Sequence, residues 1–381
     1  MDILQYTAAH TQFRERLREF CQREIIPYVD QWEAAHIVPK SVWKKMGAEG
    51  FLCTNAPVAY GGHGLDFLYS VIVAEEMTRT NHTGLAATVH SDVVVPYIVS
   101  YGAEAVKKKY IPGCTSGDII TAIAMTEPDA GSDVAAMTTT AVEVGGEVEI
   151  NGSKTFITNG INADLVVLAA RDPDAENPHQ AVSLYLVEDG TPGFERGRQL
   201  EKMGWNSQDT AELFFNKCRI PLENRLGEKN MGFVMLMEKL QQERLMCAVS
   251  AQFAIEFIVE AAVSHCKTTT DSKGKPLSKY QGLNFQLVEM MTNAHVGRVF
   301  MEKLVADHME GLNVARETCM AKFWHTDLSQ KTAGQALDLF GEAALAERNP
   351  LVRSWRDLRV LPIFAGTNEI MKIVVGKMSG L

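Results

Sequence analysis

The strongest constraint on the fold is that the apolar residues change their spacing twice along the chain. Residues 1–120 show the three-to-four-residue spacing of amphipathic helices, with one early stripe formed by Phe13, Leu17, Phe20, Cys21 and Ile25. Residues 121–230 show the two-residue alternation of half-buried strands, and residues 231–381 return to helical spacing over long apolar stretches. The order predicts an α+β fold with an N-terminal α-helical domain, a middle antiparallel β domain and a C-terminal four-helix bundle.

Turn-forming residues sharpen these predictions at three places. Gly145–Gly146 separates two alternating apolar segments, which favours a β-hairpin. A helix that begins near Glu104 is expected to end at Pro112–Gly113. Near the C-terminus, Thr367 or Asn368 is expected to cap a last helix.

Charge and cysteine usage exclude several function classes. The net charge of -10 and the pI near 5.5 disfavour a nucleic-acid partner, because phosphate binding requires a basic face. The seven cysteines are an odd number without a C-x-x-C pair, which favours reduced thiols in the cytoplasm over a disulfide or zinc framework. Charged or polar residues interrupt the apolar runs and the N-terminus lacks a signal pattern, so we expect no membrane span. No H-E-x-x-H spacing occurs, and we expect no metal site.

Two short motifs carry the strongest functional signal. "MTEPDAGSDV" begins at Met125 and "INGSKTFITNG" begins at Ile150, and the first, taken alone, is compatible with a simple exposed turn. Together with "YGGHGLD", "QQERL", "LFGE" and "FAGTNEI", in this order, they resemble the acyl-CoA dehydrogenase family over nearly the whole chain. The resemblance implies an FAD-dependent enzyme that oxidises an acyl-CoA thioester, forms a homotetramer and passes its electrons to an electron-transferring flavoprotein.

The same resemblance implies the residues of the site. The implied FAD-binding residues are Ile123, Met125, Thr126, Ser132, Phe156, Thr158, Ser272, Gln281, Thr367 and Glu369. The implied acyl-CoA-binding residues are Ser132, Arg244, Ala365 and Gly366. The chain departs from the family where a neighbouring subunit usually contacts FAD, because Thr270 and Lys273 replace an Arg and a Phe, and the segment 338–342 replaces a Gln-x-x-Gly-Gly motif.

The turn at 365–367 lacks the carboxylate that many family members use as a base. The family removes a proton from the α carbon of the thioester, and many members place a Glu where this chain has Ala365. The backbone N–H at this turn can still polarise the thioester carbonyl, but the general base is missing. Glu243, beside Arg244, is one replacement, since long-chain and branched-chain relatives carry their base there. Asp92 is the other, because a carboxylate amid apolar residues is costly unless it is paired or functional.

The two carboxylates predict different reactions. A substrate with a double bond at the α carbon has no α proton to lose, and its acidity moves to the γ carbon. The chain in this respect resembles the dehydrogenases of alicyclic CoA thioesters from anaerobic aromatic degradation. Our first hypothesis is therefore 1,4-dehydrogenation of cyclohex-1-ene-1-carboxyl-CoA with Asp92 as base. The alternatives are α,β-dehydrogenation of a saturated acyl-CoA with Glu243 as base, and a catalytically inactive flavin-binding assembly protein. Structural roles also stay open: Asp92 as a helix cap, and Glu243 or Arg244 in an ion pair inside the bundle.

Overall fold

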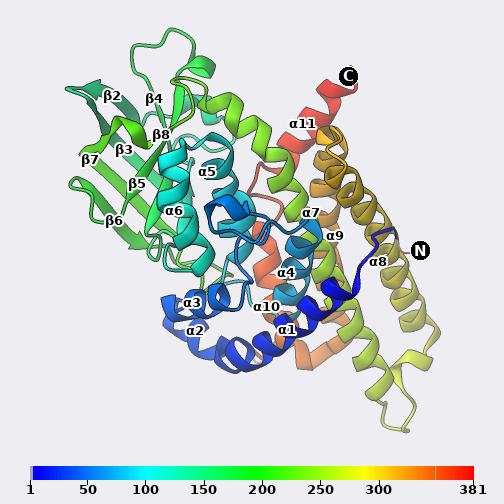
Figure 1. The fold of residues 1–381 in the computed structure, drawn as a ribbon. Coiled ribbons are helices and arrows are strands. Elements are labelled where there is room, and N and C mark those ends of the chain that lie inside the picture. The colour runs from blue at the N-terminus through cyan, green and yellow to red at the C-terminus, as the bar shows by residue number, and fades with distance from the viewer. Residues whose placement is uncertain (1–2, 348) are drawn as a thin grey trace.

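The computed structural model describes residues 3–347 and 349–381, and its elements follow the predicted α-β-α order (Figure 1). The first part contains α1 (Ala8–Glu24), α2 (Val29–Ala35), α3 (Lys40–Ala48), α4 (Phe67–Arg79), the π-helix η3 (Val89–Val94), α5 (Val95–Tyr101) and α6 (Glu104–Ser116). The early apolar stripe is confirmed, because all five of its residues are buried. The N-terminal helices therefore form around the face that their spacing defines.

Helix α6 corrects one prediction. It continues through Pro112 and Gly113 and ends only at Gly117, which adopts a left-handed conformation with φ 76°. Proline removes one backbone hydrogen bond, but the helix on both sides of it is anchored by buried residues that include Tyr110 and Cys114. Tertiary packing thus outweighs the local helix stop, and a C-cap glycine ends the helix instead.

The middle part is one sheet of eight strands. They are β1 (Thr121–Ala124), β2 (Thr140–Val144), β3 (Glu147–Ile157), β4 (Leu165–Arg171), β5 (Val182–Glu188), β6 (Phe194–Gln199), β7 (Ala211–Pro221) and β8 (Arg225–Leu226). The strand order is β6-β7-β3-β2-β4-β5-β8, and β1 also pairs with β4. The β2–β3 hairpin is confirmed, with φ 63° and 87° at Gly145 and Gly146.

The sheet is antiparallel except around β4. Strand β1 runs parallel to β4 over four residue pairs, and β2 meets β4 in parallel at Thr140 and Arg171. The prediction of a wholly antiparallel block is wrong at this point. Parallel strands need a crossover connection, and the loop after β1 together with the β2–β3 hairpin supplies it. The crossover leaves the end of β1 beside β3, where the "MTEPDAGSDV" motif starts.

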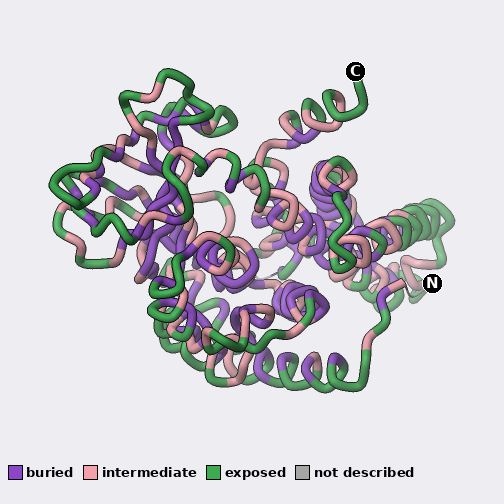
Figure 2. The backbone as a smooth tube through the Cα atoms, turned by 45° about the horizontal axis from the view of Figure 1, so that its top comes forward, coloured by how far each residue is buried: buried purple, intermediate pink, exposed green. Residues whose placement is uncertain are grey.

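The last part is the helical bundle of α7 (Gly232–Thr268), α8 (Gln281–Met309), α9 (Ala315–Phe340), α10 (Pro350–Asp357) and α11 (Asn368–Met378). Helix α7 contacts α4, α8, α9 and η3, and much of it is buried (Figure 2). By length and composition alone α7 is long and apolar enough to cross a membrane, which the sequence prediction missed. Within the protein, 61% of its most apolar window is buried, as in the central helix of a bundle.

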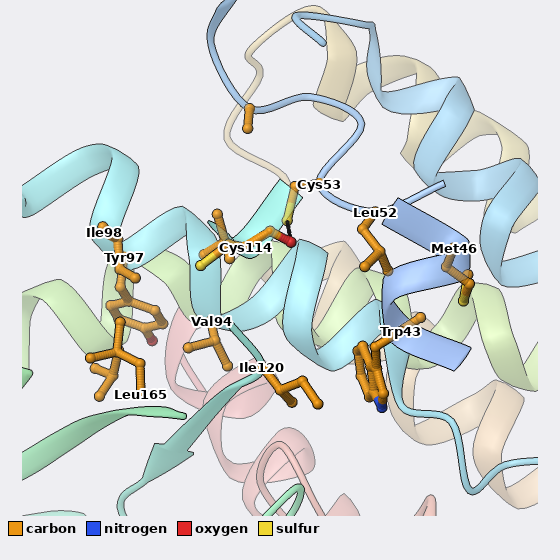
Figure 3. Close-up of a cluster of buried hydrophobic side chains, with 14 of the residues drawn as sticks. Trp43, Met46, Leu52, Cys53, Val94, Tyr97, Ile98, Cys114, Ile120 and Leu165 are labelled. Atoms are coloured by element: carbon orange, nitrogen blue, oxygen red, sulfur yellow. Dashed lines mark hydrogen bonds between the residues drawn. The ribbon is translucent and has the colours of Figure 1, made fainter. Parts of the chain in front are cut away.

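A buried cluster in the first part positions η3 and α5 (Figure 3). It includes Trp43, Leu52, Cys53, Val94, Tyr97, Ile98, Cys114, Ile120 and Leu165. The thiol of Cys53 lies 3.7 Å from the carbonyl oxygen of Cys114, and all seven cysteines are free. The cluster connects α3, α6 and the sheet to the segment that carries Asp92 and Tyr97, and so it fixes both side chains relative to α7.

Candidate active site

The turn before α11 presents unused backbone donors. Ala365 and Gly366 both have positive φ, 53° and 90°. The N–H groups of Ala365, Gly366 and Thr367 donate no hydrogen bond within the part of the chain that the structure describes. Thr367 caps α11, since its hydroxyl accepts a hydrogen bond from the N–H of Ile370 at 3.3 Å, as predicted. A carbonyl or anionic oxygen is the natural acceptor for such free donors.

Arg244 connects this turn to α7. Its Nε lies 3.4 Å from the carbonyl oxygen of Ala365, and its Nη1 lies 3.5 Å from the sulfur of Cys319. No carboxylate among the described residues pairs with Arg244, so the bundle ion pair considered above is wrong for this residue. The guanidinium keeps donors for a ligand, as an acyl-CoA-binding role requires.

Glu243 is a buried carboxylate one residue before Arg244. The hydroxyl of Tyr97, on α5, donates a hydrogen bond of 2.7 Å to its Oε1. Burial raises the pKa of Glu243 to about 7, although the Tyr97 bond and the Arg244 charge act in the opposite direction. Within the described residues Glu243 forms no ion pair. A carboxylate that titrates near neutral pH suits a general base.

Asp92 is the second buried carboxylate, and it lies inside η3. The cap prediction is wrong, because neither η3 nor α5 has a side-chain cap. Burial raises the pKa of Asp92 to about 7, and a hydrogen bond from Ser70 lowers it in part. Oδ1 of Asp92 has no hydrogen-bond partner among the residues that the structure describes. The charge of Asp92 also contributes to the raised pKa of Cys53, so its carboxyl faces α4 and the Cys53 segment. Its backbone carbonyl accepts a 2.7 Å bond from Gln242.

Helix α7 therefore brings the candidate residues together through three successive positions. Gln242 holds η3, Glu243 meets Tyr97, and Arg244 reaches the turn at Ala365. The sequence pointed to Glu243 and Arg244 but not to Tyr97.

The flavin-binding residues predicted on β1 and β3 also lie close together. Ile123, Met125, Thr126 and Thr158 are half-buried, and β1 packs against β3. Phe156 is 66% exposed and has φ 58°, a strained conformation for a bulky residue. Packing against the described residues does not account for an exposed aromatic ring on strained backbone. A planar ring system stacked on it would supply one, so these residues fit an isoalloxazine.

A buried ion pair anchors the loop between β1 and β2. Lys154 contacts Glu127 at 2.8 Å and the carbonyl oxygen of Met125 at 3.0 Å. Glu127 also accepts hydrogen bonds from the backbone N–H groups of Thr138 and Thr139. This pair was not predicted from the sequence, although both residues lie within the two motifs. Its role is to hold the loop on which Met125 and Thr126 sit.

The other predicted residues are exposed. Ser132 lies in the loop after β1, and Glu369 lies in the first turn of α11. Ser272 and Gln281 follow the far end of α7, and this end at Thr268 lies roughly 36 Å along the helix from Arg244 at 1.5 Å per residue. One chain therefore does not bring Ser272 and Gln281 to the site formed by β1, β3 and the turn. No group of described residues has the His, Cys, Asp or Glu arrangement of a metal site.

Known proteins are similar to this chain in sequence and in fold. Three family descriptions match the chain: "Acyl-CoA dehydrogenase, N-terminal domain" over residues 7–118, the middle domain over 122–218, and the C-terminal domain over 230–379. The long-chain specific acyl-CoA dehydrogenase of Rattus norvegicus mitochondria is 40% identical over 373 residues, which cover 98% of this chain and 86% of that protein.

Two solved structures extend the comparison. The crystal structure of an acyl-CoA dehydrogenase from Geobacillus kaustophilus has a TM-score of 0.96 and 45% identity, and covers 99% of both chains. A chain from a structure described as the electron transferring flavoprotein of Acidaminococcus fermentans has a TM-score of 0.93 and 32% identity, and covers 100% of this chain and 99% of that one. In both cases the similarity spans at least 99% of this chain.

Proposed function

The chain belongs to the acyl-CoA dehydrogenase family, and on this premise we propose that it catalyses the α,β-dehydrogenation of a saturated acyl-CoA with Glu243 as base. The family confirms the expected enzyme class, an oxidoreductase, and the expected cofactor, FAD. The observation that supports the proposal most is the position of Glu243. It is buried, held by Tyr97, and adjacent to the arginine that reaches the Ala365 turn.

The proposed mechanism assigns a task to each of these residues. The free N–H groups of the 365–367 turn donate hydrogen bonds to the thioester oxygen and stabilise the negative charge that develops on it. Arg244 contributes a positive charge beside the turn. Glu243 removes the α proton, and the Tyr97 hydroxyl keeps its carboxylate oriented. Met125, Thr126, Phe156 and Thr158 would hold the ring system of FAD, which would supply the acceptor for the hydride of the neighbouring carbon.

Asp92 supports a second candidate function, 1,4-dehydrogenation of cyclohex-1-ene-1-carboxyl-CoA. The observation in its favour is the free Oδ1 of a buried carboxyl group whose pKa is raised to about 7. We rank it below the Glu243 mechanism, the reverse of the order that the sequence suggested. The reason is that Asp92 faces Ser70 and the Cys53 segment inside the first part of the chain.

The acyl chain and the partners are also proposals. We propose a long saturated acyl chain first, because a relative of 40% identity is a long-chain specific dehydrogenase. An electron-transferring flavoprotein is the typical electron acceptor of the family, and we propose it here. A homotetramer in the cytoplasm remains our prediction, and it would place Ser272 and Gln281 near the FAD of another subunit. The free cysteines agree with a reducing compartment.

Anaerobic mixing distinguishes the two reactions. The purified, FAD-loaded protein is mixed with saturated acyl-CoAs of increasing length, and separately with cyclohex-1-ene-1-carboxyl-CoA, while the flavin absorbance is followed and the products are identified by mass. Bleaching by a saturated acyl-CoA with formation of the 2-enoyl product supports the proposal. Bleaching by the cyclohexene thioester alone supports the second candidate. Failure of both substrate classes would overturn both functions.

A further inference from the structure

Lys322 occupies an unusual position beneath the 365–367 turn. This lysine of α9 has 0% exposure, and its ammonium group donates hydrogen bonds to the carbonyl oxygen of Gly366 at 2.8 Å and to Oδ1 of Asn368 at 2.9 Å. Lys322 was not predicted from the sequence, because its contacts lie 44 and 46 residues further along the chain. A buried side chain thus connects the bundle to both ends of the Gly366–Asn368 segment.

The ammonium group has no carboxylate in direct contact within the described residues. Burial lowers the pKa of Lys322, and the charges of Asp327 and Glu369 oppose this effect without forming an ion pair. Asn368 stands between the charges, since its amide donates to Oδ1 of Asp327 at 2.8 Å while its oxygen accepts from Lys322. Burying a cation without an ion pair is costly, and an apolar residue of similar length would pack α9 without that cost. Packing therefore does not explain this lysine.

The orientation of the 365–367 turn does explain the presence of a lysine at this position. In a planar trans peptide the C=O and the following N–H point in opposite directions. Lys322 holds the carbonyl of Gly366, so the N–H of Thr367 points away from the bundle core. Arg244 contacts the carbonyl of Ala365, so the N–H of Gly366 points away from Arg244. Arg244 on α7 and Lys322 on α9 thus fix the two peptide planes on either side of Gly366. Ala365 and Gly366 both have positive φ angles.

We infer that Lys322 is a positioning residue, which holds the 365–367 turn so that its free N–H groups meet the thioester oxygen. The role rests on the proposed function, because it assumes that this turn polarises the substrate carbonyl. Lys322 itself does not touch the substrate in this inference. Its effect reaches the reaction through the Gly366 peptide and through Asn368.

The test compares Lys322→Met with a matched control. Methionine keeps an unbranched side chain as far as Cε and removes the ammonium donor and its charge. The control is His325→Gln on the same helix, which alters an equally buried side chain that bonds Ala321 and Gly297 and does not contact the turn. The readouts are kcat and KM for a saturated acyl-CoA, thermal unfolding, and the infrared band of a carbon-13-labelled thioester carbonyl in the bound state.

Lys322→Met should lower kcat by about 10- to 100-fold, somewhat less than the roughly 10²–10³-fold loss of a whole oxyanion donor. KM should change by less than about threefold, since the binding contacts remain. The carbonyl band should move towards its value in the free thioester. In His325→Gln the band should stay in place whatever happens to thermal stability. A band that stays in place in Lys322→Met as well would overturn the inference.

Two further outcomes remain decisive. If Lys322→Met does not fold, Thr326→Val replaces it, since the Thr326 hydroxyl bonds Asn368 and its loss should move the band the same way by less. No movement in folded Thr326→Val would then overturn the inference. If the wild-type enzyme oxidises no saturated acyl-CoA, the proposed function fails. The carbonyl band of a bound thioester still reports on Lys322 in that case, so the two failures are distinguishable.

Discussion

Replacing Glu243 by glutamine should abolish α,β-dehydrogenation and leave the fold intact. Glutamine has nearly the same volume, and its amide oxygen can still accept the hydrogen bond that Tyr97 donates to Oε1 at 2.7 Å. The variant loses only the ability to take up a proton. A positioned base contributes about 10²–10⁴-fold to the rate, so kcat for a saturated acyl-CoA should fall by at least about a hundredfold.

The pH dependence tests the same residue without removing it. Glu243 must be ionised to act as a base, and its pKa is raised to about 7 by burial. The kcat/KM of the wild-type enzyme should therefore rise with pH, fall off about tenfold per pH unit below about 6, and level above about 8. Tyr97→Phe removes a hydrogen bond to the charged form, worth about 1.5–3 kcal/mol. At 1.36 kcal/mol per pKa unit, the acidic limb should move up by about one to two units.

The assay is steady-state turnover between about pH 5 and 9 with an artificial electron acceptor, alongside thermal unfolding of each variant. Asp92→Asn is the matched control, since it neutralises the other buried carboxylate beside α7. Full activity in Glu243→Gln together with a dead Asp92→Asn enzyme would refute the reasoning and favour the alicyclic mechanism. An acidic limb that stays in place in Tyr97→Phe would show that the Tyr97 bond does not tune the base.

Three other variants test the surrounding site. The pKa of Asp92 in the folded protein, about 7, lies above its ordinary value of 3.8, so this group contributes stability at low pH that is lost as the pH rises from about 4 to 7. The gain in unfolding free energy of Asp92→Asn over the wild type should therefore be about 1–4 kcal/mol larger at pH 8 than at pH 5. An equal gain at both pH values in urea unfolding would contradict this. Phe156→Ala should lower the FAD retained after gel filtration without lowering the melting temperature of the FAD-free protein, because the ring is 66% exposed; unchanged retention would exclude it from the flavin site. In the Glu243→Gln background, Ala365→Glu should restore part of the α,β-dehydrogenation measured by product mass, provided that the double variant folds, whereas a folded but inactive double variant would show that the turn cannot carry a base.

Local sequence patterns predict those elements of the fold that neighbouring residues alone determine. The apolar stripe that includes Phe13 and Leu17 and the Gly145–Gly146 hairpin need only neighbouring residues, and both are confirmed. The parallel pairing of β1 with β4 joins Thr121 to Leu165, and helix α6 continues through Pro112 because of packing. Such features depend on contacts that the spacing of apolar residues does not report.

The candidate site likewise combines residues that a local motif predicts with residues that only long-range contacts bring in. Arg244 and Glu243 lie in a recognisable motif, but the groups that hold them or their neighbours come from distant segments. Tyr97 lies 146 residues before Glu243, and Lys322 lies 44 residues before Gly366. A single sequence shows a tyrosine within an apolar segment and a lysine within a helix, and each has an ordinary structural role available. Only the folded chain shows which partner each one meets.

The geometry of the turn explains why a methyl group suffices at position 365. In the proposed mechanism the donors that face the substrate are backbone N–H groups, and Arg244 and Lys322 fix the peptide planes of these groups through bonds to the carbonyls of Ala365 and Gly366. Both cations bond backbone carbonyl oxygens of the turn, so these bonds do not involve the side chain at position 365. The base then needs only to approach the α carbon from another element. Helix α7 offers Glu243 one residue before the arginine that contacts this turn, and the Tyr97 bond fixes its direction. Polarisation of the thioester carbonyl and removal of the α proton are thereby assigned to separate elements, so the proposed site does not require a carboxylate in the turn.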